Sequence, residues 1–331
     1  MNKFLNLRIL LAIVSFALAG CEKEKSLDTK WQLGSPQSGD VYVAGEYSGK
    51  RNIAKLWKNG VEQNLSDGTE NTYVRSVFVS GSDVYVAGWE ETKQGQVARL
   101  WKNGVVQKLR DDAFSSSASS VFVSGNDVYV AGEINSNGLS SAVVWKNDAV
   151  QYIGSGYAHS VFVSGNDVYV AGWEVSEEGY FSTVWKNGVA ERLCEEGSGA
   201  GAVSVFVSGN DVYVAGRKSS QGDAFWKNGE AQDFGYIASI FSVFVSGSDV
   251  YFAGRENGDT GATVWKNGEA QYLSGETLLS SCAWSIFVSG GDVYVAGYGY
   301  PNDTDVAIVW KNGEAQILDN GKSAYSVFVV E

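Results

Sequence analysis

Histidine is almost absent from this chain: His159 is the only one in 331 residues, and the only methionine is Met1. Metal sites built from imidazoles and Ser-His-Asp triads both need histidine held beside other reactive groups, so the composition argues against both. We therefore assign no catalytic residue and expect no metal site and no cofactor. Proline is also scarce, with two residues, whereas there are 40 glycines and 11 tryptophans, which is unusual for a helical or α/β protein.

Positive charge is in short supply as well. The chain has 25 Lys and Arg against 38 Asp and Glu, a formal net charge of −13. Such a surface repels phosphate backbones, so nucleic acid is not an expected partner. Apolar residues make up 44% and charged residues 19%, which is enough apolar surface to bury a core and too little charge for a disordered chain.

Residues 1–20 have the pattern of a signal peptide. Lys3 and Arg8 form a short basic region without any acidic residue, and the stretch from Leu10 to Leu18 is apolar except for Ser15. This run is too short to cross a bilayer stably, but it has the length of a signal-peptide core.

The four residues Leu18-Ala19-Gly20-Cys21 follow directly and resemble the lipobox of bacterial lipoproteins. The resemblance implies that Cys21 carries acyl chains and anchors the protein to a membrane without spanning it. Each buried methylene contributes about 0.8 kcal/mol to such an anchor. Residues 21–37 are then expected to form a solvated, lipidated tether. Its charged start, Glu22-Lys23-Glu24-Lys25, fits loosely the surface-export signals of Bacteroidetes-like lipoproteins. We expect the cell envelope, with the outer membrane or cell surface favoured and other membrane faces left open.

From residue 38 to residue 331 the chain is one motif repeated seven times. Trp-Lys-Asn and Ser-(Val/Ile)-Phe-Val also recur once per repeat. Asp-Val-Tyr begins each repeat at steps of 38–44 residues, at Asp40, Asp83, Asp127, Asp167, Asp211, Asp249 and Asp292. A period near forty with four short β-rich segments is typical of a β-propeller blade.

Each repeat predicts four antiparallel strands. Gly-Asn, Gly-Ser or Gly-Gly separates the first two segments, and Asn-Gly separates the last two; both are signals for two-residue hairpins, whose turns need positive φ. One repeat has Asn147-Asp148 instead, which still tolerates the left-handed conformation. The strands are apolar on both faces, so we expect both faces to be covered, with Phe78 and Trp101 packed between blades.

The ends of the repeated region predict how it closes. The first repeat lacks Ser-Val-Phe-Val before Asp40, and the chain ends with Ser326-Val-Phe-Val-Val-Glu331, which has no hairpin partner after it. We therefore predict an all-β fold: a seven-bladed β-propeller of four-stranded antiparallel blades, closed by the C-terminal strand completing the first blade. A solenoid is the alternative, but it would require capping repeats, which the sequence lacks.

The period, strand order and closure resemble the seven-bladed β-propeller class. The WD dipeptide, the kelch double glycine and the Asp-box are missing. The chain is similar to bacterial propeller lipoproteins with recently amplified Ser-Val-Phe-Val-Ser-Gly and Trp-Lys-Asn-Gly repeats. This resemblance implies a fold and no activity.

Sequence variation is concentrated in the loops expected at one face of the disc. The hairpin turns are nearly identical in every repeat, whereas the connections at the other face differ. Two positions per repeat are expected to ring the mouth of the central channel there. The position before the inner strand holds Arg75, Ser119, His159, Val203, Phe241, Trp284 and Tyr325. The position after Ala-Gly of the second strand holds Glu46, Trp89, Glu133, Trp173, Arg217, Arg255 and Tyr298.

Aromatic, guanidinium and carboxylate groups together favour a binding site, so we select eleven ligand-binding candidates. They are Arg75, His159, Phe241, Trp284, Tyr325, Trp89, Glu133, Trp173, Arg217, Arg255 and Tyr298. We expect a monomeric, membrane-anchored extracytoplasmic protein that binds a glycan or a protein and is not an enzyme. Drift of unconstrained loops would give the same variation.

Two further functions stay open. A polysaccharide-acting enzyme would need two carboxylates at the mouth at a defined separation, and the candidates by location are Glu46, Glu90, Glu133 and Glu174. An architectural subunit would bind partners along the fourth strands, where one position holds Gln63, Gln107, Gln151, Glu191, Gln232, Gln271 and Gln316. Cys194 and Cys282 are expected in crossover loops two blades apart, too distant for a disulfide, and therefore free. Asn302-Asp303-Thr304-Asp305 has only the oxygen-rich spacing of a weak calcium candidate.

Overall fold

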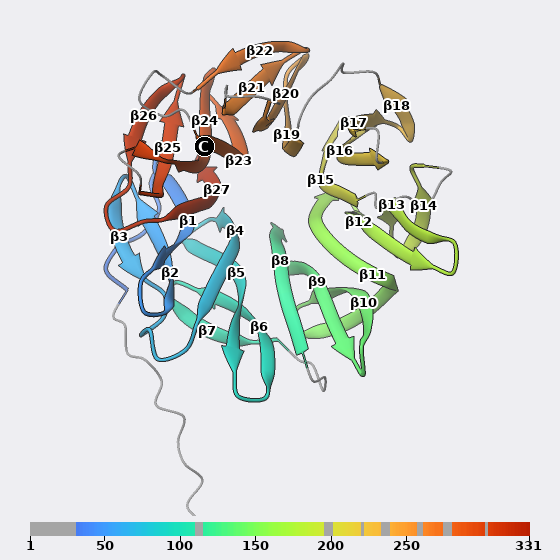
Figure 1. Cartoon of the computed structure of the whole chain (residues 1–331), viewed down its shortest axis with the longest axis horizontal. Coiled ribbons are helices and arrows are strands. Elements are labelled where there is room, and N and C mark those ends of the chain that lie inside the picture. Colours follow the sequence, from blue (N-terminus) through green and yellow to red (C-terminus); the bar gives the residue numbers. More distant parts are fainter. Residues whose placement is uncertain are drawn as a thin grey trace, which may run out of the picture.

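The computed structural model describes residues 31–109, 115–194, 201–219, 222–232, 239–256, 261–273, 280–301 and 304–331. The predicted signal peptide, Cys21 and the first ten residues of the predicted tether lie outside these ranges, as do Asn302 and Asp303. The described residues form an all-β structure of repeated four-stranded antiparallel units, as the sequence predicts. Figure 1 shows the units arranged around a centre. No helix among the described residues is long and apolar enough to span a membrane.

We number the units along the chain and give their strands from the centre outwards. Unit 1 contains β27 (Ser323–Val329), β1 (Val41–Ser48), β2 (Asn52–Lys58) and β3 (Val61–Asn64); unit 2 contains β4 (Thr72–Ser80), β5 (Asp83–Thr92), β6 (Gly95–Lys102) and β7 (Val105–Lys108). Unit 3 contains β8 (Ser115–Ser124), β9 (Asp127–Ser136), β10 (Leu139–Lys146) and the first part of β11 (Ala149–Ser164); unit 4 contains the rest of β11, β12 (Asp167–Ser176), β13 (Gly179–Lys186) and β14 (Val189–Arg192).

Unit 5 contains β15 (Gly201–Ser208), β16 (Asp211–Ser219), β17 (Gly222–Lys227) and β18 (Glu230–Gln232). Unit 6 contains β19 (Ser239–Ser246), β20 (Asp249–Arg255), β21 (Ala262–Lys266) and β22 (Glu269–Tyr272); unit 7 contains β23 (Ser281–Ser289), β24 (Asp292–Gly299), β25 (Val306–Lys311) and β26 (Glu314–Ile317). Because β11 pairs with β10 along its first part and with β12 along its second, units 3 and 4 form one continuous seven-stranded sheet.

The hairpin turns adopt the conformations that their residues predict. The Asn of each Asn-Gly turn has a φ of 47–53°, and Asp148, which replaces Gly in unit 3, has a φ of 75°. The Gly between the first and second strands has a φ of 57–61°. In an antiparallel meander these two turns lie at one end of the unit, which we call the hairpin end. The second-to-third connection and the crossover lie at the other end, which we call the loop end.

A polar network repeats at every hairpin end and explains the Asp, Tyr, Lys and Asn of the motif. In unit 2, Lys102 Nζ lies 2.8 Å from Asp83 Oδ2 and 5.4 Å from the ring centroid of Tyr85. Asn103 donates to Asp83 Oδ1 at 2.8 Å and accepts from the Val84 N–H at 2.9 Å. The hydrogen bond from Lys102 is the main reason why the pKa of Asp83 lies below its usual value. The network ties the Asn-Gly turn to the start of the second strand.

The innermost strands of successive units contact one another around the centre (Figure 1). In each contact the Ser of Ser-(Val/Ile)-Phe-Val accepts a hydrogen bond from a backbone N–H of the next unit, at 3.1–3.3 Å. The phenylalanines of the same motif touch their neighbours with ring centroids 4.7–4.9 Å apart: Phe78, Phe122, Phe162, Phe206, Phe244, Phe287, Phe328 and again Phe78. The C-terminal β27 pairs antiparallel with β1, with Val41 opposite Val329.

The core lies between neighbouring units and is built from both faces of each sheet. Trp101 of unit 2 is 2% exposed and packs with Tyr42 and Leu56 of unit 1, which confirms its predicted role. Phe78 contacts Phe122 and Phe328 of the two adjacent units, as predicted. Because neighbouring units cover both faces of the inner strands, the apolar residues on both sides of these strands are explained.

Residues 31–37 differ from the predicted solvated tether. Leu33 is buried against units 1 and 2, and Trp31 packs against the same cluster. The Gln32 N–H donates to Gln63 Oε1 at 3.0 Å, and Lys58 Nζ donates to the Ser35 carbonyl at 2.9 Å. The prediction was based on the polar residues of this segment. It did not consider the apolar side chains of Trp31 and Leu33, which pack against the core.

Most of the recurring glutamines of the fourth strands face the next unit. Gln63, Gln151 and Gln271 lie against the turn glycine of the following unit, so closely that a Cβ at that glycine would meet the amide nitrogen at 3.0 Å. Gln63 is buried, with 6% exposure. Gln151 and Gln271 lie beside the following unit but remain exposed, so only Gln63 is withdrawn from solvent.

Candidate functional site

The seven positions predicted to precede the inner strands lie inside those strands, each at a β-bulge. In unit 2, Val74 pairs with Gly88 and Ser76 pairs with Ala87, so Arg75 between them has no opposite residue. The same shift leaves His159, Phe241 and Trp284 unpaired. The inner strands thus begin earlier than the sequence predicts, and the bulge turns one side chain out of the regular alternation.

The glycine of each Ala-Gly is required by this bulge. A Cβ added to Gly88 would overlap the carbonyl oxygen of Tyr73, and one added to Gly172 would overlap that of Tyr157. Only glycine, which has no Cβ, allows the backbone of the bulged strand to approach the second strand this closely.

Six of the predicted residues form one contiguous group, which we call the mouth cluster: Arg75, Trp89, Phe241, Trp284, Tyr298 and Tyr325. The ring centroid of Trp284 lies 4.3 Å from that of Phe241, 6.1 Å from that of Tyr325 and 6.3 Å from that of Tyr298. The cluster spans units 6, 7, 1 and 2 near the loop end and crosses the junction of the two chain ends.

Arg75 lies between two aromatic rings at one side of this cluster. Its guanidinium carbon is 4.1 Å from the ring centroid of Tyr325 and 4.5 Å from that of Trp89, which are cation–π distances. Trp89 is also stacked on Tyr73, with centroids 5.1 Å apart. Held between two rings, the guanidinium has a defined position, and one of its nitrogens donates to the Val74 carbonyl at 2.8 Å.

A buried carboxylate, Glu46, lies next to Arg75. It is 7% exposed; its Oε1 accepts from the Tyr325 hydroxyl at 2.8 Å, and its Oε2 is 3.8 Å from Arg75 Nη1 without a hydrogen bond. Burial and the neighbouring Glu46 carboxylate raise the pKa of Tyr325 to about 12. The indole N–H groups of Trp89 and Trp284 are covered and find no acceptor among the described residues. The cluster therefore combines apolar rings with polar groups that are only partly satisfied.

A second, smaller group surrounds His159 in unit 4. Tyr157 stacks on His159 and on Trp173, with centroids 5.6 and 5.1 Å away. Glu133 of unit 3 is buried beside it, and burial together with this carboxylate raises the pKa of Tyr157. Solvent reaches part of His159, but surrounding protein disfavours the imidazolium and lowers its pKa to about 4. His159 is therefore neutral at physiological pH.

The lowered pKa of His159 predicts that this residue makes the stability of the fold depend on pH. Between pH 6.5 and 4 the unfolded chain holds a proton on His159 that the folded chain lacks, so stability is highest above pH 6.5 and falls as the pH is lowered. Because His159 is the only histidine, its imidazole NMR signal is unambiguous, and we expect it to titrate near pH 4. His159→Gln should remove this part of the pH-dependence of unfolding. A titration midpoint above 6 would contradict the prediction.

The two remaining candidates are Arg217 in unit 5 and Arg255 in unit 6. Arg217 is exposed at the loop end of β16, where its carbonyl accepts from Ser182 at 2.6 Å. Arg255 ends β20 and is close enough to Tyr298 and Cys282 to influence both electrostatically.

Sequence analysis missed three contributors to these groups. Tyr73 and Tyr157 lie two residues before the bulge and form the stacks with Trp89 and Trp173. Glu46 occupies one of the predicted mouth positions but is not among the eleven ligand-binding candidates. The available signal was that Tyr occurs at this position only in the two repeats that also carry Trp after Ala-Gly.

The cysteines are free, as predicted, but one is placed differently. Cys282 lies within β23, paired with Tyr298, and not in a crossover loop. It is 3% exposed, and burial raises the pKa of its thiol to about 12, so it is not a nucleophile at neutral pH. Among the described residues, no three His, Cys, Asp or Glu side chains are grouped so that they could hold a metal ion.

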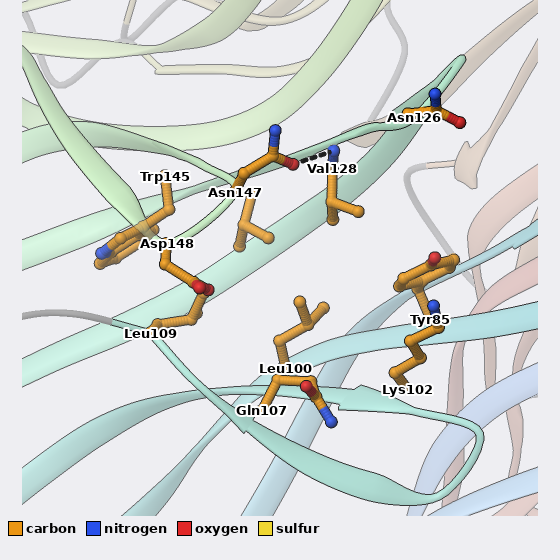
Figure 2. A pocket seen from close by; sticks show the side chains of 11 residues that line it. Tyr85, Leu100, Lys102, Gln107, Leu109, Asn126, Val128, Trp145, Asn147 and Asp148 are labelled. Carbon is orange, nitrogen blue, oxygen red and sulfur yellow. Dashed lines mark hydrogen bonds between the residues drawn. The ribbon is translucent and has the colours of Figure 1, made fainter.

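Three cavities among the described residues lie between units, and no predicted mouth residue lines any of the three. One of about 250 Å³ lies at the hairpin end between units 2 and 3, where Gln107, Lys102 and Asp148 surround it (Figure 2). A second, of about 350 Å³, lies at the equivalent place between units 7 and 1. A third, of about 610 Å³, lies at the loop end between units 7 and 1.

Three solved structures share this fold at low sequence identity. A puromycin-hydrolysing peptidase from Mycobacterium tuberculosis aligns with a TM-score of 0.61 and 12% identity over 86% of this chain and 52% of its own. An acylaminoacyl peptidase from Pyrococcus horikoshii aligns with a TM-score of 0.52 and 11% identity over 86% and 51%. A putative 6-phosphogluconolactonase from Bacteroides uniformis aligns with a TM-score of 0.51 and 15% identity over 89% and 100%.

The chain spans about half the length of the two peptidases, and at these identities the likeness shows the fold alone. No family model matches the chain, and no curated protein matches its sequence.

Proposed function

We propose that this chain is a lipid-anchored, extracytoplasmic seven-bladed β-propeller that binds a glycan at its mouth cluster without chemical conversion. Each of the seven units is then a blade. The pairing of β27 with β1 and the succession of phenylalanine contacts from Phe78 back to Phe78 support closure by the C-terminal strand.

The membrane anchor in this proposal rests on the sequence. The basic start, the short apolar run and Cys21 at the end of a lipobox-like motif support export and acylation. The envelope of a bacterial cell is the corresponding location.

The observation that carries the binding function is the arrangement of the mouth cluster. Bulges bring Arg75, Phe241, Trp284 and Tyr325 from four units into one group, although regular strands would leave them in separate positions. Flat rings suit the apolar faces of sugars, and the partly satisfied Glu46 carboxylate, the guanidinium and the two indole N–H groups can bind hydroxyls.

A second candidate is a polysaccharide-acting enzyme. Glu46 and Glu133 are buried carboxylates near the loop end, and the structures that share the fold include peptidases and a putative lactonase. Glycoside hydrolysis would need two carboxylates within about 5–10 Å of each other.

The binding function can be tested with a glycan array and two variants of the full-length protein. We expect Trp284→Ala and Arg75→Ala each to weaken binding to the retained glycan by about tenfold or more, since Trp284 contacts three rings of the cluster and Arg75 is held between two. Tyr272→Ala, at an exposed ring on the outer strand β22, is the matched control and should bind normally. Unchanged binding by both variants would exclude the mouth cluster, and shortening of the glycan during incubation would favour the enzyme.

A further inference from the structure

The groove between units 7 and 1 at the loop end has a feature that the mouth cluster lacks: two exposed tyrosines on its walls. Its volume is about 610 Å³, within the range of small-molecule sites. Tyr47, at the end of β1, is 40% exposed, and Tyr300, just after β24, is 42% exposed. None of the eleven predicted binding residues lines this groove.

Strand alternation explains why both tyrosines line the same groove. Val43 of β1 packs against unit 7, and Tyr47, four residues later, lies on the same face. Tyr294 and Ala296 of β24 pack against unit 1, and Tyr300 continues that alternation. The two rings therefore belong to facing surfaces of neighbouring units.

This pairing occurs at only one junction. The corresponding pairs elsewhere in the sequence, such as Ser48 with Glu90 and Glu91 with Ile134, never combine two aromatic residues. The junction between units 7 and 1 is thus distinguished from the other six by its sequence.

The floor of the groove is a turn, residues 318–322, that is tied to both units. Trp57 Nε1 donates to the Asp319 carbonyl at 3.1 Å, and the Lys322 N–H donates to the Glu46 carbonyl at 2.8 Å. The Asn320 amide nitrogen donates to Glu62 Oε1 at 3.0 Å, which leaves its carbonyl oxygen available as an acceptor. A floor held by these bonds is formed before any ligand arrives, which reduces the entropy cost of binding.

The charges on the walls are nearly balanced. Lys322 Nζ lies 3.8 Å from Asp305 Oδ2, and Asp319 adds one further carboxylate. An anionic ligand would meet two carboxylates and one already paired ammonium, whereas a neutral polyol would find both donors and acceptors. Exposed rings together with such groups suit a ligand with apolar faces and a rim of hydroxyls.

We propose that this groove binds a neutral saccharide unit, which stacks on Tyr47 or Tyr300 and hydrogen-bonds to Asn320 and Asp305. This site is separate from the mouth cluster and does not depend on it. Its ligand class follows from the two rings, the excess of one carboxylate over the ammonium and the volume of the groove.

The test uses saturation-transfer NMR on the full-length protein with three probes: methyl β-glucoside, methyl β-galactoside and methyl α-mannoside. We expect transfer to at least one of them, and weaker binding of sodium glucuronate. Tyr47→Ala and Tyr300→Ala should each raise the dissociation constant about tenfold, whereas Tyr47→Phe, which keeps the ring, should stay within about twofold of wild type.

Control variants distinguish loss of binding at the groove from loss of binding at the mouth cluster and from loss of the fold. Tyr152→Ala removes an exposed ring of β11 that does not line the groove and should bind normally, and all variants should unfold at the wild-type temperature. Trp284→Ala should leave the groove signal unchanged, even if it abolishes glycan binding at the mouth. The proposal is overturned if none of the three glycosides receives saturation, if both alanine variants bind like wild type, or if Trp284→Ala alone removes the signal.

Discussion

Deleting Ser323–Glu331 should abolish cooperative folding of the chain. The deletion removes β27, whose Ala324, Val327 and Val329 are buried, and with it the only pairing of β1 on its inner side. Each buried valine contributes roughly 1.5–3 kcal/mol, while the whole fold is expected to be stable by about 5–15 kcal/mol. The loss of Phe328, which touches both Phe78 and Phe287, adds to this cost.

Far-UV circular dichroism during heating would measure the effect. The truncated chain should show no sharp transition and should be cleaved rapidly by protease, because β1 becomes an exposed edge. A synthetic peptide of residues 323–331, added in excess, should restore part of the transition by pairing with β1. An unchanged melting temperature after truncation would contradict the closure that we propose.

The fold was predictable because its signals are local and repeated. Asn59-Gly60 and its six counterparts predict a hairpin whatever surrounds them, and the structure has the positive φ that these residues favour. Trp101 is buried and Phe78 is partly buried because both faces of the strands are apolar, a pattern that is visible in the sequence. The pairing of β27 with β1 agrees with the missing strand at the start of the first repeat.

The candidate site was less predictable because it depends on register. The bulge appears only as a one-residue shift in the alternation, since Val74 and Val77 are both buried although they lie three residues apart. Several apolar residues adjoin this shift in the sequence, so the pairing with β5 is needed to show that Arg75 is the displaced residue. The contact of Arg75 with Tyr325 also joins residues 250 positions apart. The sequence could place both near the mouth, but it could not show that their side chains touch.

The tryptophans buried between neighbouring units provide the second large effect. Trp226 is fully buried between units 4 and 5, and its indole N–H donates to the Leu193 carbonyl at 2.8 Å. Trp226→Ala should destabilise the fold by roughly 3–5 kcal/mol, the usual cost of replacing a large buried aromatic residue with alanine. Chemical denaturation would measure this as a lower midpoint with an unchanged slope.

Replacing tryptophan with phenylalanine separates packing from hydrogen bonding. Trp185 is equally buried, but its indole N–H has no acceptor among the described residues. Trp226→Phe leaves the Leu193 carbonyl without its donor, whereas Trp185→Phe removes a polar group that was already unsatisfied. We therefore expect Trp226→Phe to be more destabilising than Trp185→Phe by about 1–2 kcal/mol. Equal losses at the two sites would mean that packing alone determines the contribution of these tryptophans to stability, and that the hydrogen bond between units 4 and 5 contributes nothing.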